Sequence, residues 1–273
     1  MSSRLRFLFS LAAAIAAASL LAAALRRRAP PSGLAARLVP APMAAAAARN
    51  RSFVLWLHGL GDSGPANEPI RNFFSAPEFR LTKWAFPSAP NSPVSCNHGA
   101  VMPSWFDIHE LPMSSGSPQD DSGVLKAVEN VHAMIDKEVA DGIPPENIFV
   151  CGFSQGGRTS ALHCALTLAS VLLYPKTLGG GAVFSGWLPF GSSVTERISP
   201  EARKTPILWS HGIADNVVLF EAGQAGPPFL QNAGFSCEFK AYPGLGHSIS
   251  KEELYSLESW IKNHLKASQE KEN

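Results

Sequence analysis

The sequence has few cysteines, almost no net charge and no acidic residue near its N-terminus. Its four cysteines, Cys96, Cys151, Cys164 and Cys237, show no CxxC spacing, so they predict neither a disulfide framework nor a zinc site. Free, buried thiols in a reducing compartment are the interpretation that this pattern favours. The formal net charge of +1 argues against a protein that binds nucleic acid.

Charge is unevenly distributed along the chain. The first acidic residue is Asp62 and the first lysine is Lys83. Eight arginines precede Asp62, namely Arg4, Arg6, Arg26, Arg27, Arg28, Arg37, Arg49 and Arg51. Without these eight, the 23 basic residues fall to 15 against 22 acidic ones, so the rest of the chain is mildly acidic.

Residues 1–50 differ in composition from the rest. Residues 7–25 form an uncharged, alanine-rich run with arginines on both sides. The run is long enough to cross a bilayer, but alanine contributes little transfer energy and the flanking arginines give no orientation. Three interpretations stay open: a signal peptide or signal anchor, an organellar transit peptide, and a second translation start at Met43 that gives a cytosolic form. The domain is accordingly cytoplasmic, or anchored to a membrane or imported through this segment, which we expect to be loosely ordered.

The remainder of the chain contains no linker composition and no internal repeat. We therefore expect one domain over residues 52–267, followed by a short tail at 268–273.

Short apolar runs alternate with helical patterns along this domain. From Val124 the apolar residues recur at helical spacing, with Asp120 and Asp121 before them and Gly142 after them. Residues 94–119 show little periodicity and predict a long irregular excursion. Other expected helices cover residues 158–173 and 251–266, and expected strands cover 53–57, 84–86, 148–152, 182–184, 206–210 and 236–241. The alternation predicts an α/β domain with a mostly parallel, helix-covered sheet.

The pentapeptide Gly152-Phe-Ser-Gln-Gly156 matches the G-x-S-x-G pattern of a nucleophile elbow. A strand is expected before it and a helix after it, which is the context that the elbow requires. Glycine is needed because the serine sits at a strained turn, where a Cβ two residues away would collide with a neighbouring strand or helix. Ser154 is the predicted nucleophile, and a structural serine in a glycine-rich turn is the alternative.

A serine nucleophile needs a base, and the base needs an orienting carboxylate. In folds with such an elbow the chain order is serine, then acid, then histidine. Asp215 and His247 follow two later strands, so both should lie at the sheet edge that carries Ser154. Glu221 is the alternative to Asp215.

Other histidines and carboxylates suit these roles less well. His211 lies too close to its own strand end and is expected to be structural. Asp62 and Asp107 precede the serine and break the chain order. His163 falls in the helix expected after the elbow, and His98 in the irregular excursion, where a surface position is favoured over one in the pocket.

An oxyanion hole needs two donors directed at the acyl oxygen. The backbone N–H of Gln155 is one candidate, because it follows the nucleophile. The glycine-rich loop at residues 58–61 should supply the other through the amide of Leu60, although a simple tight turn also fits this loop.

These motifs together resemble a known family. The motifs are Leu57-His-Gly-Leu-Gly-Asp-Ser-Gly64, Pro87-Ser-Ala-Pro90, Met102-Pro-Ser-Trp-Phe-Asp107, Gly152-Phe-Ser-Gln-Gly-Gly157, Gly186-Trp-Leu-Pro189, His211-Gly-Ile-Ala-Asp215 and Tyr242-Pro-Gly-Leu-Gly-His247. In this order the chain resembles the acyl-protein thioesterase/lysophospholipase-like carboxylesterases, and among them the plant SOBER-like members, over nearly all of residues 52–267. The resemblance implies an α/β-hydrolase domain without a large cap, which hydrolyses esters or thioesters.

The resemblance also supports the site residues. It implies the triad Ser154, Asp215 and His247, with no metal and no organic cofactor. Leu60 and Gln155 remain the oxyanion donors. The resemblance places Trp105 and Trp187 in the walls of the substrate pocket, with an ordinary core aromatic as the alternative for Trp105.

Some positions depart from the family pattern. Arg158 stands where a small residue is usual, Gly186 where a cysteine is common, and Asn216 where a proline follows the acid. None of these removes a catalytic group. The segment that corresponds to the family's lid, residues 111–121, is rich in proline and serine, so short acyl groups such as acetyl are an alternative to long-chain depalmitoylation.

The sequence thus predicts acyl transfer through a covalent serine intermediate. Its substrate would be an acyl ester or thioester, S-acylated proteins included. A lysophospholipase, an acyltransferase or peptidase with the same triad, and a ligand-binding protein on a hydrolase scaffold are the alternatives. Membrane association is expected only through residues 7–25.

Overall fold

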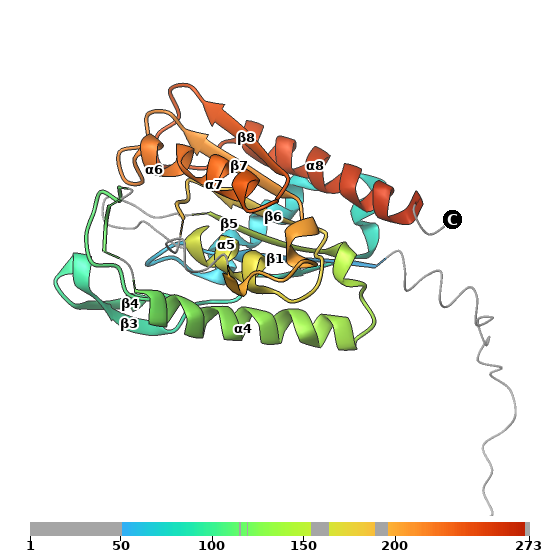
Figure 1. Ribbon diagram of the computed structural model, residues 1–273, viewed down its shortest axis with the longest axis horizontal. Helices are drawn as coiled ribbons and strands as arrows, with labels where there is room; N and C mark the ends of the chain where they lie inside the picture. Colours follow the sequence, from blue (N-terminus) through green and yellow to red (C-terminus); the bar gives the residue numbers. More distant parts are fainter. Residues whose placement is uncertain (1–50, 115, 119, 154–163, 189–195, 271–273) are drawn as a thin grey trace, which may run out of the picture. The chain divides into compact units, whose positions relative to one another are not determined.

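A parallel sheet of six strands runs through the protein in the order β2-β1-β5-β6-β7-β8 (Figure 1). The computed structural model describes residues 51–270 without 115, 119, 154–163 and 189–195. All pairings in this sheet are parallel. The strands are β1 (Ser52–Leu57), β2 (Thr82–Ala85), β5 (Ile148–Phe153), β6 (Gly180–Phe184), β7 (Ile207–Gly212) and β8 (Cys237–Tyr242). The predicted α/β class with a mostly parallel sheet is confirmed.

Helices cover both faces of this sheet (Figure 1). The α-helices are α3 (Gly64–Asn67), α4 (Asp121–Ala140), α5 (Cys164–Leu173), α6 (Phe220–Gln224), α7 (Gly226–Asn232) and α8 (Lys251–Glu270). Short 3-10 helices span Glu68–Phe73, Pro77–Leu81, Ser95–Asn97, Pro145–Asn147 and Ala202–Lys204. Because water reaches neither face, the inner strands β1, β5, β6 and β7 are buried along their whole length.

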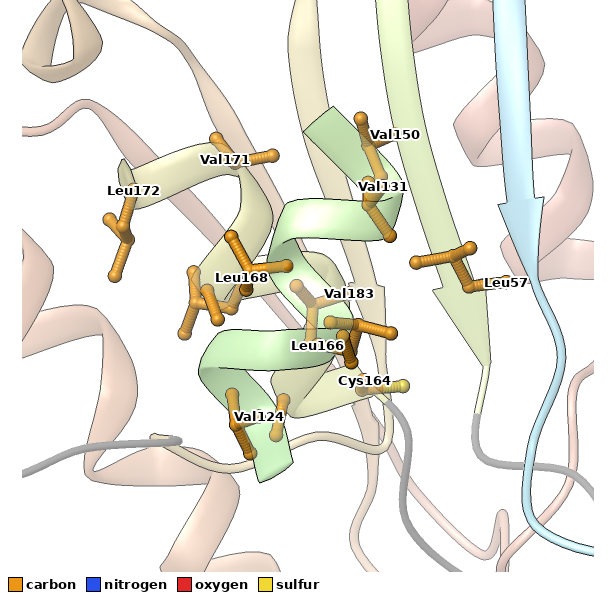
Figure 2. Close-up of a cluster of buried hydrophobic side chains, with 14 of the residues drawn as sticks. Leu57, Val124, Val131, Val150, Cys164, Leu166, Leu168, Val171, Leu172 and Val183 are labelled. Atoms are coloured by element: carbon orange, nitrogen blue, oxygen red, sulfur yellow. The ribbon is translucent and has the colours of Figure 1, made fainter. Parts of the chain in front are cut away.

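The alternation of side chains along β1 divides the core into two clusters. Phe53, Leu55 and Leu57 point to the face covered by α4 and α5, whereas Val54 and Trp56 point to the face covered by α8. Figure 2 shows part of the first cluster, where side chains of the two helices lie over those of the strands: Val124, Val131, Leu166, Leu168, Val171, Leu172, Cys164, Leu57, Val150 and Val183. This packing fixes the carboxyl ends of the strands.

Helix α4 has the boundaries that the sequence predicts. The Asp120 side chain accepts a hydrogen bond from the Gly123 amide at 2.9 Å, which caps the helix at its positive end. Gly142 follows the helix with a φ of +90°, a conformation that favours glycine.

The expected irregular excursion at residues 94–119 is partly regular. An antiparallel hairpin pairs β3 (Asn91–Val94) with β4 (Ala100–Pro103). His98 and Gly99 turn the chain with φ values of +55° and +76°. The prediction was wrong here because two four-residue strands, one of them containing Pro93, are too short to show a period of two.

Strand β7 is also longer than predicted. It continues to Gly212, so His211 lies in the strand rather than in the loop after it. All four cysteines are free thiols, with Cys151 and Cys164 buried and the other two half-buried.

Neither a membrane span nor a metal cluster is found over residues 51–270, apart from the gaps named above. No helix there is long and apolar enough to cross a bilayer. No group of three His, Cys, Asp or Glu side chains there could hold a metal ion. The segment 1–50, with its three interpretations, lies outside the described residues.

Candidate active site

The carboxyl ends of the strands lead to the predicted site residues. β1 runs into the loop at residues 58–61, β7 into the turn that contains Asp215, and β8 into the loop that contains His247. Carboxyl ends of parallel strands share one edge of the sheet, which is where α/β proteins build their sites. β5 ends directly before Ser154 in the sequence; Ser154 and Gln155 lie outside the described residues.

Asp215 and His247 are in direct contact. His247 Nδ1 lies 2.8 Å from Asp215 Oδ2, and both side chains are almost completely buried. Asp215 Oδ1 accepts hydrogen bonds from the amides of Val217 and Val218 at 2.9 and 3.0 Å. The turn thus satisfies one oxygen of the carboxylate and His247 the other.

These contacts keep the Asp215 carboxylate ionised. Burial alone would raise the pKa of Asp215, but the hydrogen bond and charge of His247 and the amides of Val217 and Val218 outweigh it and hold this pKa below its usual value. An ionised carboxylate accepts the Nδ1 proton of His247. The lone pair of the imidazole is then on Nε2, as a general base requires.

The imidazole is held beside the end of β5. The His247 ring stacks on Phe153 with centroids 5.8 Å apart and planes at 30°. Phe153 is the last residue of β5 and immediately precedes Ser154 in the sequence. Two backbone hydrogen bonds tie the loops together: the Ala214 amide donates to the Leu245 carbonyl, and the Ile213 amide to the Tyr242 carbonyl, each at 3.0 Å.

The first glycine of the elbow motif is sterically required. A Cβ on Gly152 would lie 2.1 Å from Thr167 Oγ1 of α5 and 3.3 Å from the Leu57 carbonyl oxygen of β1. Helix and strand therefore leave no room for a side chain, which agrees with the reason expected from the sequence. Gly156 and Arg158 lie outside the described residues.

The loop at residues 58–61 is organised around a buried histidine. His58 Nδ1 lies 2.6 Å from the Gly59 carbonyl, while Nε2 accepts a hydrogen bond from the Ala89 amide at 2.9 Å. Burial lowers the pKa of His58 despite that carbonyl and the charge of Asp62, so the ring is neutral with its proton on Nδ1. No separate role was predicted for His58, but its contacts fix the loop that carries Leu60.

Leu60 itself is fully buried. The next amide, that of Gly61, donates to the Pro103 carbonyl at 2.8 Å. Within the part of the chain that the structure describes, no backbone carbonyl accepts a hydrogen bond from the Leu60 amide. That amide can therefore serve an external acceptor.

The two tryptophans predicted for the pocket lie in different places. Trp187 is buried and lines a narrow pocket with Met113, Asp107, Asp120 and the apolar side chains Phe106, Ile108, Val124 and Ala165. The cavity measures about 10 Å³, which is the size of one water molecule. Trp105 is not among these residues; its Nε1 donates to the His58 carbonyl at 3.1 Å and its ring lies 5.4 Å from that of His58.

The expected lid segment at residues 111–121 is joined to the turn after Asp215. The Met113 amide donates to the Val217 carbonyl at 2.8 Å, and the Leu219 amide donates to the Met113 carbonyl at 3.1 Å. This pairing was not predicted, because backbone hydrogen bonds between distant short segments leave no side-chain pattern in the sequence.

The residues considered as alternatives for the acid and the base, where the structure describes them, do not take part in the contact between Asp215 and His247. Glu221 and His98 are exposed, and His163 lies outside the described residues. Asp107 binds the amide and hydroxyl of Ser95. His211 is fully buried in β7, as expected for a structural histidine.

Comparison with known proteins gives a consistent result. The phospholipase/carboxylesterase family model matches residues 41–265. A protein of Oryza sativa subsp. japonica named "Probable carboxylesterase" is 97% identical over 273 residues, 100% of both chains. Acyl-protein thioesterase 1 of Cryptococcus neoformans var. neoformans is 37% identical over 227 residues, 78% of this chain and 92% of the relative. The crystal structure of Arabidopsis thaliana SOBER1 is 66% identical, covers 79% of this chain and 99% of its own, and has a TM-score of 0.75. The chain therefore belongs to the phospholipase/carboxylesterase family of α/β-hydrolases.

Proposed function

We propose that the protein is a serine carboxylesterase that hydrolyses acyl esters or thioesters through Ser154, His247 and Asp215. The observation that carries this proposal is the 2.8 Å contact between Asp215 and His247, whose ring stacks on Phe153, the residue before Ser154. The names of the relatives, carboxylesterase and acyl-protein thioesterase, support the same bond types.

In the proposed mechanism His247 Nε2 removes the proton of Ser154 as the serine oxygen attacks the acyl carbonyl carbon. Asp215 stabilises the imidazolium that forms. The amides of Leu60 and Gln155 stabilise the oxyanion. The C–O or C–S bond then breaks, His247 returns its proton to the leaving alcohol or thiol, and water releases the acid from the acyl-enzyme by the same steps. No step requires a metal or an organic cofactor.

We take the narrow pocket beside Trp187 as the acyl pocket, because the resemblance assigns Trp187 to it, and its size then favours a short acyl group. Its cavity of about 10 Å³ holds roughly one water, and Met113, one of its walls, is fixed by two backbone hydrogen bonds. A palmitoyl chain would require this wall to move. We therefore propose acetyl and similar short groups as the preferred acyl part, with depalmitoylation of S-acylated proteins as the second candidate because a relative is named acyl-protein thioesterase.

Two measurements test the proposal. A fluorophosphonate should label the wild-type protein and Ser75→Ala, which changes an exposed serine outside the site, but not Ser154→Ala. A series of p-nitrophenyl esters from acetate to palmitate should show kcat/KM falling with chain length. Labelling that persists in Ser154→Ala would remove the assigned nucleophile. A wild-type protein that neither reacts nor hydrolyses any ester or thioester would favour the ligand-binding alternative.

A further inference from the structure

A second imidazole lies beside the proposed catalytic carboxylate. His211 is fully buried near the end of β7. Its Nε2 lies 3.0 Å from the Val218 carbonyl oxygen and 3.6 Å from Asp215 Oδ2. The proposed mechanism gives this ring no role.

The surroundings of His211 fix its protonation state. A carbonyl oxygen can only accept, so the ring proton is on Nε2. Nδ1 has no hydrogen-bond partner among the described residues, so a second proton there would be a buried, unpaired donor. Burial lowers the pKa of His211; the Val218 carbonyl and Asp215 act in the opposite sense, and His247 adds to the lowering. The ring is therefore neutral and donates through Nε2.

The hydrogen bond from His211 acts on Asp215 through one residue. The carbonyl of Val218 accepts from His211, and the amide of the same residue donates to Asp215 Oδ1 at 3.0 Å. Val218 is thus held at both ends, by the imidazole and by the carboxylate. The two groups lie on either side of the Val218 Cα, so a carbonyl that lost its donor could rotate and displace the amide that orients Asp215.

The His211 ring is confined on two sides. A Cβ on Gly223 of α6 would lie 2.1 Å from His211 Nδ1, so the helix backbone closes one side. The Phe220 ring lies 5.9 Å away at 74°. Both contacts hold Nε2 toward Val218 and Asp215.

We propose that His211 is a positioning residue, whose Nε2–H holds the Val218 carbonyl and, through the main chain of Val218, keeps the amide of that residue in place to orient Asp215 toward His247. The proposal rests on the triad proposed above. It gives a function to the histidine of the His211-Gly-Ile-Ala-Asp215 motif, which is otherwise only a buried strand residue.

Two substitutions of His211 separate positioning from packing. His211→Leu removes the donor, and we expect kcat on p-nitrophenyl acetate to fall by about a hundredfold, with KM nearly unchanged. His211→Gln places an amide donor near the position of Nε2 and should recover most of this loss. The acidic limb of the pH–rate profile should move in His211→Leu, because Asp215 stabilises the imidazolium less well, and should return in His211→Gln.

His132, a histidine in α4, provides a matched control. His132 Nε2 lies 2.8 Å from the Ser170 carbonyl, and burial lowers its pKa despite that carbonyl and Asp136. His132→Leu therefore makes the same chemical change away from the proposed triad. It should leave kcat and the pH profile as in the wild type.

A third variant and a second measurement make the test independent of activity. Gly223→Ala should displace the intact His211 ring and lower kcat by about tenfold, with an unchanged circular dichroism spectrum. In the NMR spectrum the proton between His247 and Asp215 should give a downfield resonance. This resonance should shift in His211→Leu and Gly223→Ala but remain in His211→Gln and His132→Leu.

The possible results are distinct. Folded His211→Leu protein with the wild-type resonance and kcat would overturn the positioning role. So would a loss that His211→Gln does not reverse. A wild-type protein with the downfield resonance but no esterase activity would refute the proposed function, while the shift of that resonance in His211→Leu would still decide the role of His211.

Discussion

Replacing Asp215 by Asn tests whether this carboxylate sets the tautomer of His247. Asp215 Oδ1 accepts from the amides of Val217 and Val218 at 2.9 and 3.0 Å, and Oδ2 lies 2.8 Å from His247 Nδ1. Asparagine has one side-chain oxygen, and the two amide donors direct it toward themselves. Its NH₂ group then faces His247 Nδ1, which must accept, so the ring proton moves to Nε2.

With the proton on Nε2, His247 cannot remove a proton from Ser154. We expect Asp215→Asn to lower kcat on p-nitrophenyl acetate by roughly four orders of magnitude, as the same change does in the trypsin-type triad. That factor corresponds to about 5 kcal/mol of transition-state stabilisation. KM should be nearly unchanged because no substrate-binding group is altered. Thermal unfolding should show a folded protein, since both amide hydrogen bonds are kept.

Glu221→Gln is the matched control for this experiment. It removes an exposed carboxylate in the first turn of α6 and should retain wild-type kcat. A folded Asp215→Asn enzyme within about tenfold of wild type would refute the reasoning. Loss of activity in Glu221→Gln would instead assign the acid to the alternative that the chain order allows.

Burial raises the pKa of Glu253 to about 7, against hydrogen bonds from Ser250 that lower it. Because the folded state holds this proton more tightly, the free energy of unfolding should fall by up to about 3 kcal/mol as pH rises from about 4.5 to about 7. Urea unfolding of Glu253→Gln should lack this slope; an equal slope would contradict the assignment. Gly152→Ala places a methyl group 2.1 Å from Thr167 Oγ1. We expect this change to lower the free energy of unfolding by about 1–3 kcal/mol. A second substitution in the same chain, Thr167→Ala, should partly restore it. If the effects of the two substitutions simply add, the steric explanation is wrong. We also predict that a fluorescent fusion of the full chain leaves the cytosol, whereas one that starts at Met43 remains there. Cytosolic fluorescence from both would exclude a targeting role for the preceding segment.

Much of the fold could be predicted because its strands are buried on both faces. A strand such as β5 must then be apolar along its whole length, and the residue at which the apolar run ends marks the sheet edge. This is why the pairing of Asp215 with His247 could be expected from two separate loops. The boundaries of α4 were also predictable, since Asp120 and Gly142 act through local backbone chemistry.

Other features depend on contacts that leave no local pattern. Each strand of the β3–β4 hairpin has four residues, which is too few for a period to emerge. Trp105 and Trp187 are both buried aromatics in the sequence motifs, yet Trp187 lines the narrow pocket beside Met113, while Trp105 hydrogen-bonds to the His58 carbonyl. Whether a tryptophan lines the pocket or hydrogen-bonds to His58 depends on packing among many residues, which cannot be predicted from composition.

The turn at Asp215 contains both predictable and unpredictable features. The role of the Asp215 carboxylate could be predicted from the sequence, whereas the other contacts of the turn are made by the main chain and could not. The Val218 carbonyl accepts a hydrogen bond from His211, and the Val218 amide donates one to Asp215. The neighbouring Val217 carbonyl and Leu219 amide hydrogen-bond to the main chain of Met113 in the pocket wall. Because one short segment makes all these hydrogen bonds, the acid of the proposed triad and the Met113 wall of the narrow pocket form a single hydrogen-bonded unit. A displacement of the Met113 main chain must therefore act on the amides that orient Asp215.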